Sequence, residues 1–168
     1  MADILLGAGT IFMKEVEDNT PPETLFDEEN KVGVTYGGAT LDIKPEVKEI
    51  ENDFGEVKVS SITKFAISLK CGLAEIDGEK VKQTMGVGTY TEAVESNPST
   101  YIISDSDTKL KTYAVGFKHK NNNTKVTVVA TNTEGLSLAF DKENETKMEP
   151  TFTAKKDAVG NWLRIEGL

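Results

Sequence analysis

Two stretches of the sequence decide the fold: LDIKPEVK at residues 41–48 and VKVSSITKFAISLKC at residues 57–71. In both, apolar residues largely keep to odd positions, which is the period of a β-strand with one apolar face. The turn-like NDFG at 52–55 joins them, so the pair predicts a long antiparallel hairpin. Strands of this length exceed the usual five or six residues. Part of the hairpin is therefore expected to project beyond the core and to need a partner.

The remaining pattern predicts a mainly β protein, an antiparallel sandwich or barrel with one short α-helix. Good helix formers place the helix at 73–85, and Gly86 is positioned to end it. Pro45 predicts an edge position or a bulge in its strand. Further short strands are expected at 101–103, 110–119, 125–131, 136–140, 148–154 and 162–165, and turn signals separate several of them.

Length and composition favour a single soluble domain over residues 1–168. No apolar run approaches the roughly 20 residues that cross a bilayer, and the first residues lack a secretory pattern. Cys71 is the only cysteine, so an intrachain disulfide and a cysteine metal cluster are excluded. These features predict synthesis in a reducing cytoplasm, without membrane attachment.

The net charge of −9 argues against a protein that binds nucleic acid tightly. From Met1 to Ser60, five Lys residues stand against fourteen acidic residues, and the rest of the chain is balanced. Between about residues 10 and 36 the apolar period fails and acidic residues accumulate around a Pro21-Pro22 pair. We expect a long acidic loop or arm there, which is either solvated and mobile or functional.

No residue pattern indicates catalysis, a metal site or a cofactor. His119 lies in a Lys-His-Lys cluster without a nucleophile or an orienting carboxylate, so a solvated turn residue is expected. Cys71 continues the apolar parity of its strand and is expected in the core. The glycine pairs Gly7/Gly9 and Gly86/Gly88 lack the context of a dinucleotide loop. The acidic stretches at 105–107 and 141–145 lack the spacing of a calcium loop.

The order of elements resembles the major tail tube protein family of siphophages, the long-tailed bacteriophages. The similarity is carried by DILLGAGT at 3–10, GGAT at 37–40 and the long hairpin that leads directly into the helix. GLSLAF at 135–140, PTFTAKKD at 150–157 and Trp162 extend it over nearly the whole chain. None of these motifs is a catalytic fingerprint.

The resemblance implies a structural virion protein of a phage tail, made and assembled in the bacterial host cytoplasm. Its copies would form hexameric rings, stacked as a hollow tube through which DNA passes without specific binding. Other tail proteins, such as the tape measure and the tail terminator, would be further partners. No enzymatic activity and no cofactor are implied.

The same resemblance implies candidate sites on the hairpin and on the acidic region at about residues 10–36. The candidate lumen-facing residues are Asp42, Lys44, Glu46, Lys48, Lys58, Ser60 and Lys64. The candidate inter-ring residues are Glu15, Glu17, Asp18, Asp27, Glu28 and Glu29. If this acidic region contacts the next ring, deletion of residues 18–31 is expected to leave folding normal and to block tube formation.

A second interpretation stays open, in which the chain is a monomeric β-sandwich binding module, adhesin-like, that recognises a glycan or a protein. Tyr36, Tyr90, Tyr101 and Trp162 would then supply the binding surface.

Overall fold

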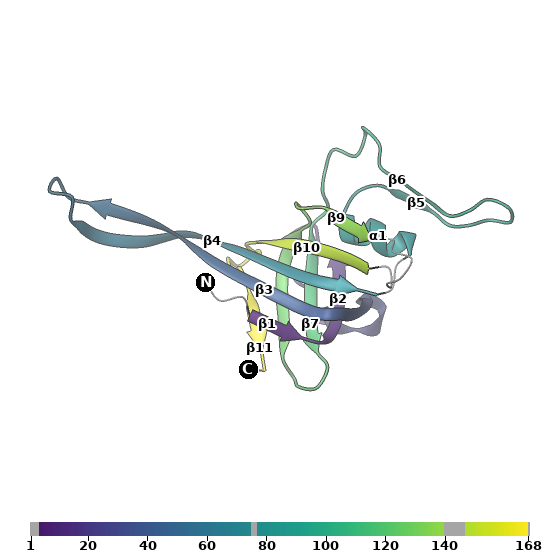
Figure 1. Cartoon of the computed structure of the whole chain (residues 1–168), viewed down its shortest axis with the longest axis horizontal. Coiled ribbons are helices and arrows are strands. Elements are labelled where there is room, and N and C mark those ends of the chain that lie inside the picture. The colour runs from purple at the N-terminus through teal and green to yellow at the C-terminus, as the bar shows by residue number, and fades with distance from the viewer. Residues whose placement is uncertain (1–3, 75–76, 140–146, 168) are drawn as a thin grey trace.

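The computed structural model describes residues 4–74, 77–139 and 147–167, and Figure 1 shows their arrangement. The elements are β1 (Ile4–Gly7), β2 (Gly9–Glu15), η1 (Glu23–Phe26), η2 (Glu28–Asn30), β3 (Lys31–Glu51), β4 (Val57–Leu73), α1 (Gly78–Met85), β5 (Thr89–Thr91), β6 (Thr100–Ile102), β7 (Tyr113–His119), β8 (Lys125–Thr131), β9 (Leu136–Ala139), β10 (Lys147–Lys155) and β11 (Arg164–Glu166). The mainly β class with one α-helix is confirmed. Among these residues no helix is long and apolar enough to cross a membrane.

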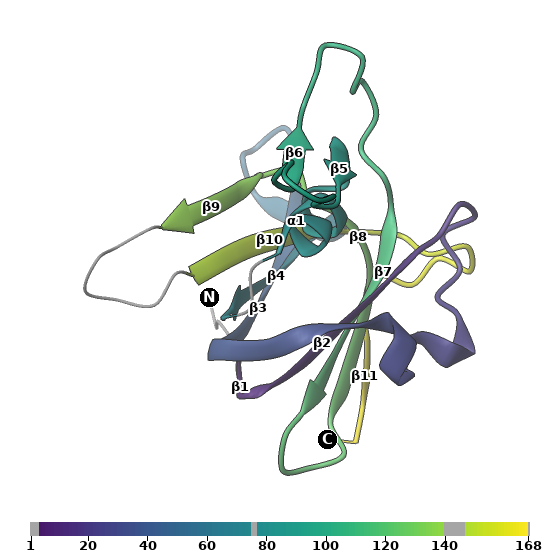
Figure 2. The ribbon, with the colours of Figure 1, turned by 90° about the vertical axis from the view of Figure 1, so that its right-hand side faces the viewer.

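The strand pairings close on themselves to form a barrel. The order β8-β7-β2-β3-β4-β10 returns to β8, because the end of β10 at Thr153–Lys155 pairs with Val129–Thr131 of β8. The first half of β10 pairs instead with β9, so β9 lies outside the closed ring. β11 and β1 add to β8 and β3, and every pairing is antiparallel. Figure 2 looks along the molecule, with the long strands seen nearly end on.

The barrel interior holds the main hydrophobic core. Alternate residues of each strand point inward, among them Ile11, Leu41, Leu69, Phe117 and Phe152, each at most 1% exposed. A second, smaller cluster lies on the outer side of β2, β7 and β8, where Leu25 and Phe26 of η1 cover Phe12 and Ala114. β7 is therefore buried on both faces, which is why its sequence shows no alternation.

Most of the expected elements are present with shifted ends. The hairpin is formed by β3 and β4, and the expected strands after the helix correspond to β6 to β11. The last residue of the expected strand at 136–140, Phe140, lies outside the described residues. Gly86 ends α1 in the left-handed conformation as predicted, with φ of 72°, but the helix begins at Gly78 instead of residue 73. Residues up to Leu73 belong to β4, because long-range pairing to β3 and β10 extends the strand that far.

The expected acidic loop over about residues 10–36 is corrected by the structure. Residues up to Glu15 form β2, and residues from Lys31 onward begin β3, so only the segment 16–30 connects strands. Within this segment Leu25 is 1% exposed and Asn30 is 9% exposed. The segment is folded onto the barrel, because burial of Leu25 and Phe26 offsets the cost of ordering a mostly acidic stretch.

The start of α1 offers a test of local stabilisation. The Asp77 carboxylate accepts a hydrogen bond from the Lys80 backbone N–H at 2.8 Å, which satisfies one free donor of the first turn. Asp77→Ala is expected to lower the free energy of unfolding by about 1 kcal/mol, whereas Asp77→Asn keeps the cap and the stability. Urea denaturation of the two variants measures the difference, and equal losses would contradict the capping role.

Candidate assembly surface

The outer part of the β3–β4 hairpin, residues 46–64, projects from the barrel, and we call it the distal hairpin (Figure 1). Asn52 is half-buried, and every other described side chain of the distal hairpin is exposed. No other described strand pairs with its two edges. β1 leaves β3 at Leu41, and β10 leaves β4 at Ser68. The distal hairpin is therefore a two-stranded ribbon with two open edges, a form that is marginally stable alone.

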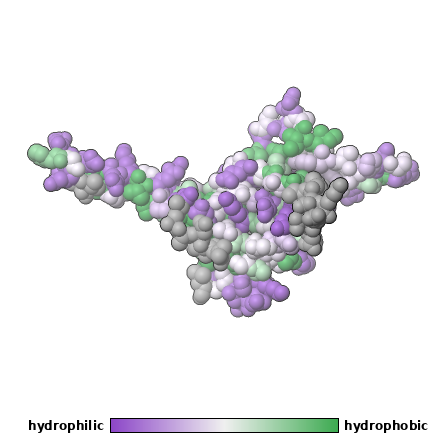
Figure 3. Space-filling view, in the orientation of Figure 1, coloured by the Kyte–Doolittle hydropathy of each residue, from purple (hydrophilic) through white to green (hydrophobic). Residues whose placement is uncertain are grey.

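The distal hairpin exposes large apolar side chains, and two of them, Val47 and Val59, belong to the parity that was expected to face the core. Val47 and Ile62 lie opposite each other and are 52% and 55% exposed. Ile50 and Val59 form a second cross-strand pair, 51% and 53% exposed. Figure 3 shows hydrophobic atoms among the mostly hydrophilic ones on this projection. Phe54 at the tip is 90% exposed.

A β-bulge at Thr63 controls which side chains share a face. The pairing runs regularly to Glu46 opposite Lys64, and then Val47 lies opposite Ile62, so Thr63 is the extra residue. The Thr63 hydroxyl donates to the Glu46 carbonyl at 3.0 Å, which stabilises this conformation. From Ile62 to Val59, up to a second register shift, the residues of β4 point to the face opposite the one that simple alternation predicts. The bulge thereby pairs Val47 with Ile62 and Ile50 with Val59, and the two pairs lie on opposite faces because three residues separate Val47 from Ile50.

The bulge divides the candidate lumen-facing residues. Asp42, Lys44, Glu46 and Lys48 share the face opposite the core-facing Leu41, and Lys64 joins them through its pairing with Glu46. Ser60 lies opposite Glu49 and points to the other face of the ribbon, so the prediction that it shares a face with Lys48 is corrected. Ser61, instead of Ser60, lies opposite Lys48. Lys58 belongs to β4, but its side chain is not among those that the structure describes.

Charges on this shared face alternate in sign and partly neutralise one another. Lys64 lies 3.1 Å from the Glu46 carboxylate, and Lys44 lies 3.6 Å from that of Asp42. Exposed pairs of this kind contribute about 0–1 kcal/mol each. They add little to stability, but they leave a surface with no strong net charge.

The candidate inter-ring residues do not form one free arm. Glu15 pairs with Lys111 at 2.8 Å, Glu28 with Lys31 at 2.8 Å, and Glu29 with Lys14 at 3.7 Å. Asp18 accepts a hydrogen bond from the Thr20 backbone N–H. Glu17 and Asp27 make no ion pair within the described part of the chain. Deletion of residues 18–31 would remove Leu25 from the second cluster, so normal folding of that variant is no longer expected.

The cysteine and the histidine, whose side chains could take part in catalysis, lie in unreactive environments. Burial raises the pKa of the Cys71 thiol to about 12, so the nucleophilic thiolate is absent at neutral pH. His119 was expected to be a solvated turn residue, but it is the last residue of β7 and is half-buried. Its Nδ1 accepts hydrogen bonds from two backbone N–H groups, of Asn121 and Asn122, in the turn that follows. Among the residues described, no group of three or more His, Cys, Asp or Glu is placed to hold a metal ion.

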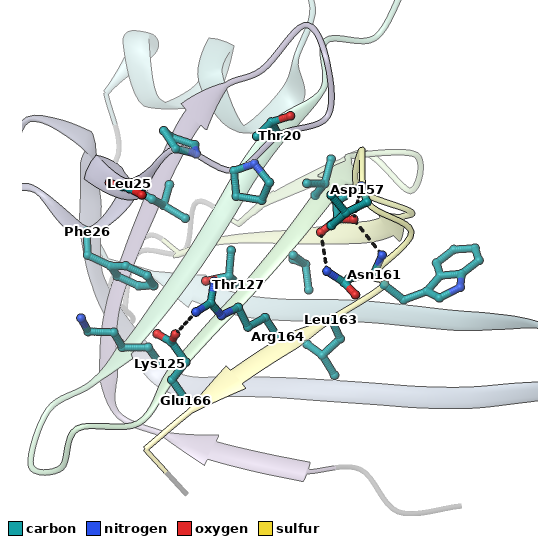
Figure 4. Close-up of a pocket in the computed structure, with 17 residues that line it drawn as sticks. Thr20, Leu25, Phe26, Lys125, Thr127, Asp157, Asn161, Leu163, Arg164 and Glu166 are labelled. Carbon is teal, nitrogen blue, oxygen red and sulfur yellow. Dashed lines mark hydrogen bonds and ion pairs between the residues drawn. The ribbon is translucent and has the colours of Figure 1, made fainter.

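Two hollows lie on the surface of the barrel. The larger, with a volume of about 450 Å³, lies between η1, β8 and the segment that ends in β11 (Figure 4). Lys125, Arg164 and Glu166 line it beside Phe26 and Trp162, and the acid and arginine pair with each other. The smaller, of about 390 Å³, lies beside Tyr36, whose ring is covered by the Lys147 ammonium at 4.5 Å.

The four aromatic residues of the binding-module interpretation are distributed over three places. Trp162 lines the larger hollow and Tyr36 the smaller one, while Tyr90 and Tyr101 pair across β5 and β6. The Tyr101 hydroxyl donates to the Val87 carbonyl at 2.8 Å and is thus engaged within the chain. These residues do not build one binding surface.

Comparisons with known proteins gave only remote structural similarities. No family model matches the chain, and no curated protein matches it. A chain from the virion of a native gene transfer agent particle aligns with a TM-score of 0.46 and 8% identity, over 94% of this chain and 95% of that chain. A chain from the sheath-tube complex of an extracellular contractile injection system, PVC, in the extended state aligns with a TM-score of 0.44 and 12% identity, over 94% and 88%. At these values neither similarity bears on the function of the chain.

Proposed function

We propose that this chain is a structural, non-enzymatic subunit that assembles with copies of itself through the distal hairpin. The observation that carries the proposal is the combination of two open strand edges and two exposed apolar pairs on one projecting ribbon. Full burial of an aliphatic side chain is worth about 1.5–3 kcal/mol, so covering four half-exposed ones favours association by several kcal/mol. Unpaired backbone groups on the edges would gain partners in the same step.

The position of the hairpin favours a closed ring of copies. The distal hairpin extends away from its own barrel, so its natural contact is the barrel of another copy (Figure 1). Such a contact joins two different surfaces, and head-to-tail contacts of this type either close into rings or continue as filaments. The hexameric ring, the stacked hollow tube and its place in a phage tail come from the family resemblance and are part of this proposal.

The charged face of the hairpin suits a channel for DNA. Asp42, Lys44, Glu46, Lys48 and Lys64 present both signs, two of the lysines are paired with acids, and the whole chain carries −9. A lumen lined by this face would neutralise few phosphates, and DNA would pass without salt-sensitive binding. Glu17, Asp18 and Asp27 are candidates for a contact between rings. The tape measure and the tail terminator would be further partners of the assembly.

Electron microscopy of the purified chain over a concentration series tests the proposal. Rings or hollow tubes are expected above a threshold concentration, because association depends on mass action. Monomeric particles at every concentration would contradict self-assembly and would favour the monomeric binding module. Turnover of a substrate that a single carboxylate substitution abolishes would contradict the non-enzymatic role.

A further inference from the structure

A second projection leaves the barrel between α1 and β7, and its residues 89–108 form what we call the acidic arm. The arm contains Glu92, Glu95, Asp105 and Asp107 and no Lys or Arg. Its strands β5 and β6 pair only with each other, outside the barrel sheet. No ion pair within the described residues involves any of the four acids. Three large apolar side chains beside them are exposed: Val94 at 61%, Ile102 at 59% and Ile103 at 54%.

The end of β7, its connection to β8 and the first residue of β8 carry the opposite charge, and we call these residues, 118–125, the basic turn. It contains Lys118, Lys120 and Lys125 and no acidic residue. His119 and Asn122 hold its backbone through hydrogen bonds from Asn121 and Thr124, and the Thr124 hydroxyl donates to the Gly167 carbonyl at 3.0 Å. Neither Lys118 nor Lys120 makes an ion pair within the described chain. The basic turn is thus an ordered cationic surface, and two of its amines have no acidic partner among the residues that the structure describes.

The acidic arm and the basic turn lie at opposite ends of the molecule. In Figure 1 the arm is at the upper right and the β7–β8 turn at the bottom, and Figure 2, turned about the vertical axis, keeps the arm at the top and the turn at the bottom. Within one chain the two surfaces therefore lie apart. Copies stacked along this axis would bring the arm of one against the turn of the next.

We propose that the acidic arm of one copy binds the basic turn of the next copy and that this contact stacks the assembly. The inference rests on the proposed function, because the partner is a second copy of this chain. Charge complementarity selects the turn as the surface that the arm meets, and the exposed apolar residues of the arm supply area to bury. The acidic segment 16–30 is a less suitable partner for the basic turn of another copy, because it already lies beside the basic turn of its own molecule. There the Lys125 ammonium lies 5.0 Å from the centre of the Phe26 ring.

A charge-swap experiment on the full chain tests this contact. Glu92→Lys with Glu95→Lys and Asp105→Lys leaves Asp107 as the one acid of the arm and makes the arm cationic, and Lys118→Glu with Lys120→Glu leaves Lys125 as the one base of the turn and makes the turn anionic. Each variant alone sets like charges against each other and is expected to raise the concentration needed for stacking by at least about tenfold. The combined variant restores opposite charges and is expected to regain stacking. The matched control is Glu134→Lys with Glu149→Lys, which also adds positive charge, at exposed sites outside both surfaces.

Particle length by electron microscopy and sedimentation over a salt series give the readout, with thermal unfolding as the check that each variant folds. Stacking of the wild type is expected to weaken towards about 1 M salt, where the Debye length falls to about 3 Å. Rings that form but no longer stack in the single-surface variants support the inference. Unchanged stacks in those variants would overturn it and leave the proposed function standing. A wild-type chain that never assembles would overturn both.

Discussion

Replacement of residues 47–63 by Asn-Gly is expected to leave a folded barrel that no longer assembles. Glu46 and Lys64 face each other directly, so a two-residue turn between them closes a shorter hairpin without strain. None of the removed side chains belongs to either hydrophobic cluster. The free energy of unfolding should therefore change by less than about 1 kcal/mol, whereas both apolar pairs and most of the open edges disappear. Sedimentation velocity and urea denaturation measure the two properties separately.

A milder variant distinguishes loss of apolar contact from loss of length. Val47→Thr with Ile62→Thr keeps the ribbon and its β-branched side chains but replaces apolar surface by hydroxyl groups. It is expected to shift assembly to higher concentration, between the wild type and the shortened chain. Val159→Thr, at an 82% exposed site outside the hairpin, is the matched control. Normal tubes from the shortened chain would show that another surface drives assembly.

The hairpin and most strands were predictable because their residues face the core on one side and solvent on the other. From Leu41 to Pro45 and from Phe65 to Cys71, the expected parity matches the pairing in β3 and β4. The prediction that part of the hairpin projects is also confirmed. Such half-buried strands have a period of two that a single sequence shows directly.

The elements that were missed depend on contacts distant in sequence. β2 shows no alternation, because its inner face packs in the barrel and its outer face is covered by η1. Leu25 is one apolar residue in an acidic stretch, and its burial follows from where β7 and β8 lie. The start of α1 was placed too early because β10 and β3 extend β4 to Leu73. In each case tertiary pairing overrode the local signal.

The candidate site was predictable in outline but not in its faces. The bulge at Thr63 has no distinct signal in the SSITK sequence around it, since serine, threonine and isoleucine all fit a regular strand. One extra residue moved Ser60 to the opposite face and set Ile62 opposite Val47 and Val59 opposite Ile50. The exposure of Val47 and Ile62 likewise depends on where the barrel ends, which the alternation does not show.

Phe117→Ala is expected to cost about 3–5 kcal/mol in the free energy of unfolding, the largest effect of any single substitution considered for this chain. Phe117 is fully buried in the barrel core, and its ring lies against Gly9 of β2 so closely that a Cβ at Gly9 would come within 2.5 Å of it. Removal of the ring leaves a cavity between two paired strands, which the surrounding barrel can fill only in part.

Phe54→Ala is the matched control, because the same side chain is 90% exposed at the tip of the distal hairpin. Its effect on the unfolding of the monomer should stay within about 0.5 kcal/mol. The two substitutions together separate folding from assembly: a loss of stability belongs to Phe117, and any loss of assembly with normal stability belongs to Phe54. Urea denaturation at low protein concentration measures the first effect, and sedimentation at high concentration measures the second. A large loss of monomer stability from Phe54→Ala would mean that the hairpin tip packs on the barrel in solution, and the distal hairpin would then not be free to meet another copy.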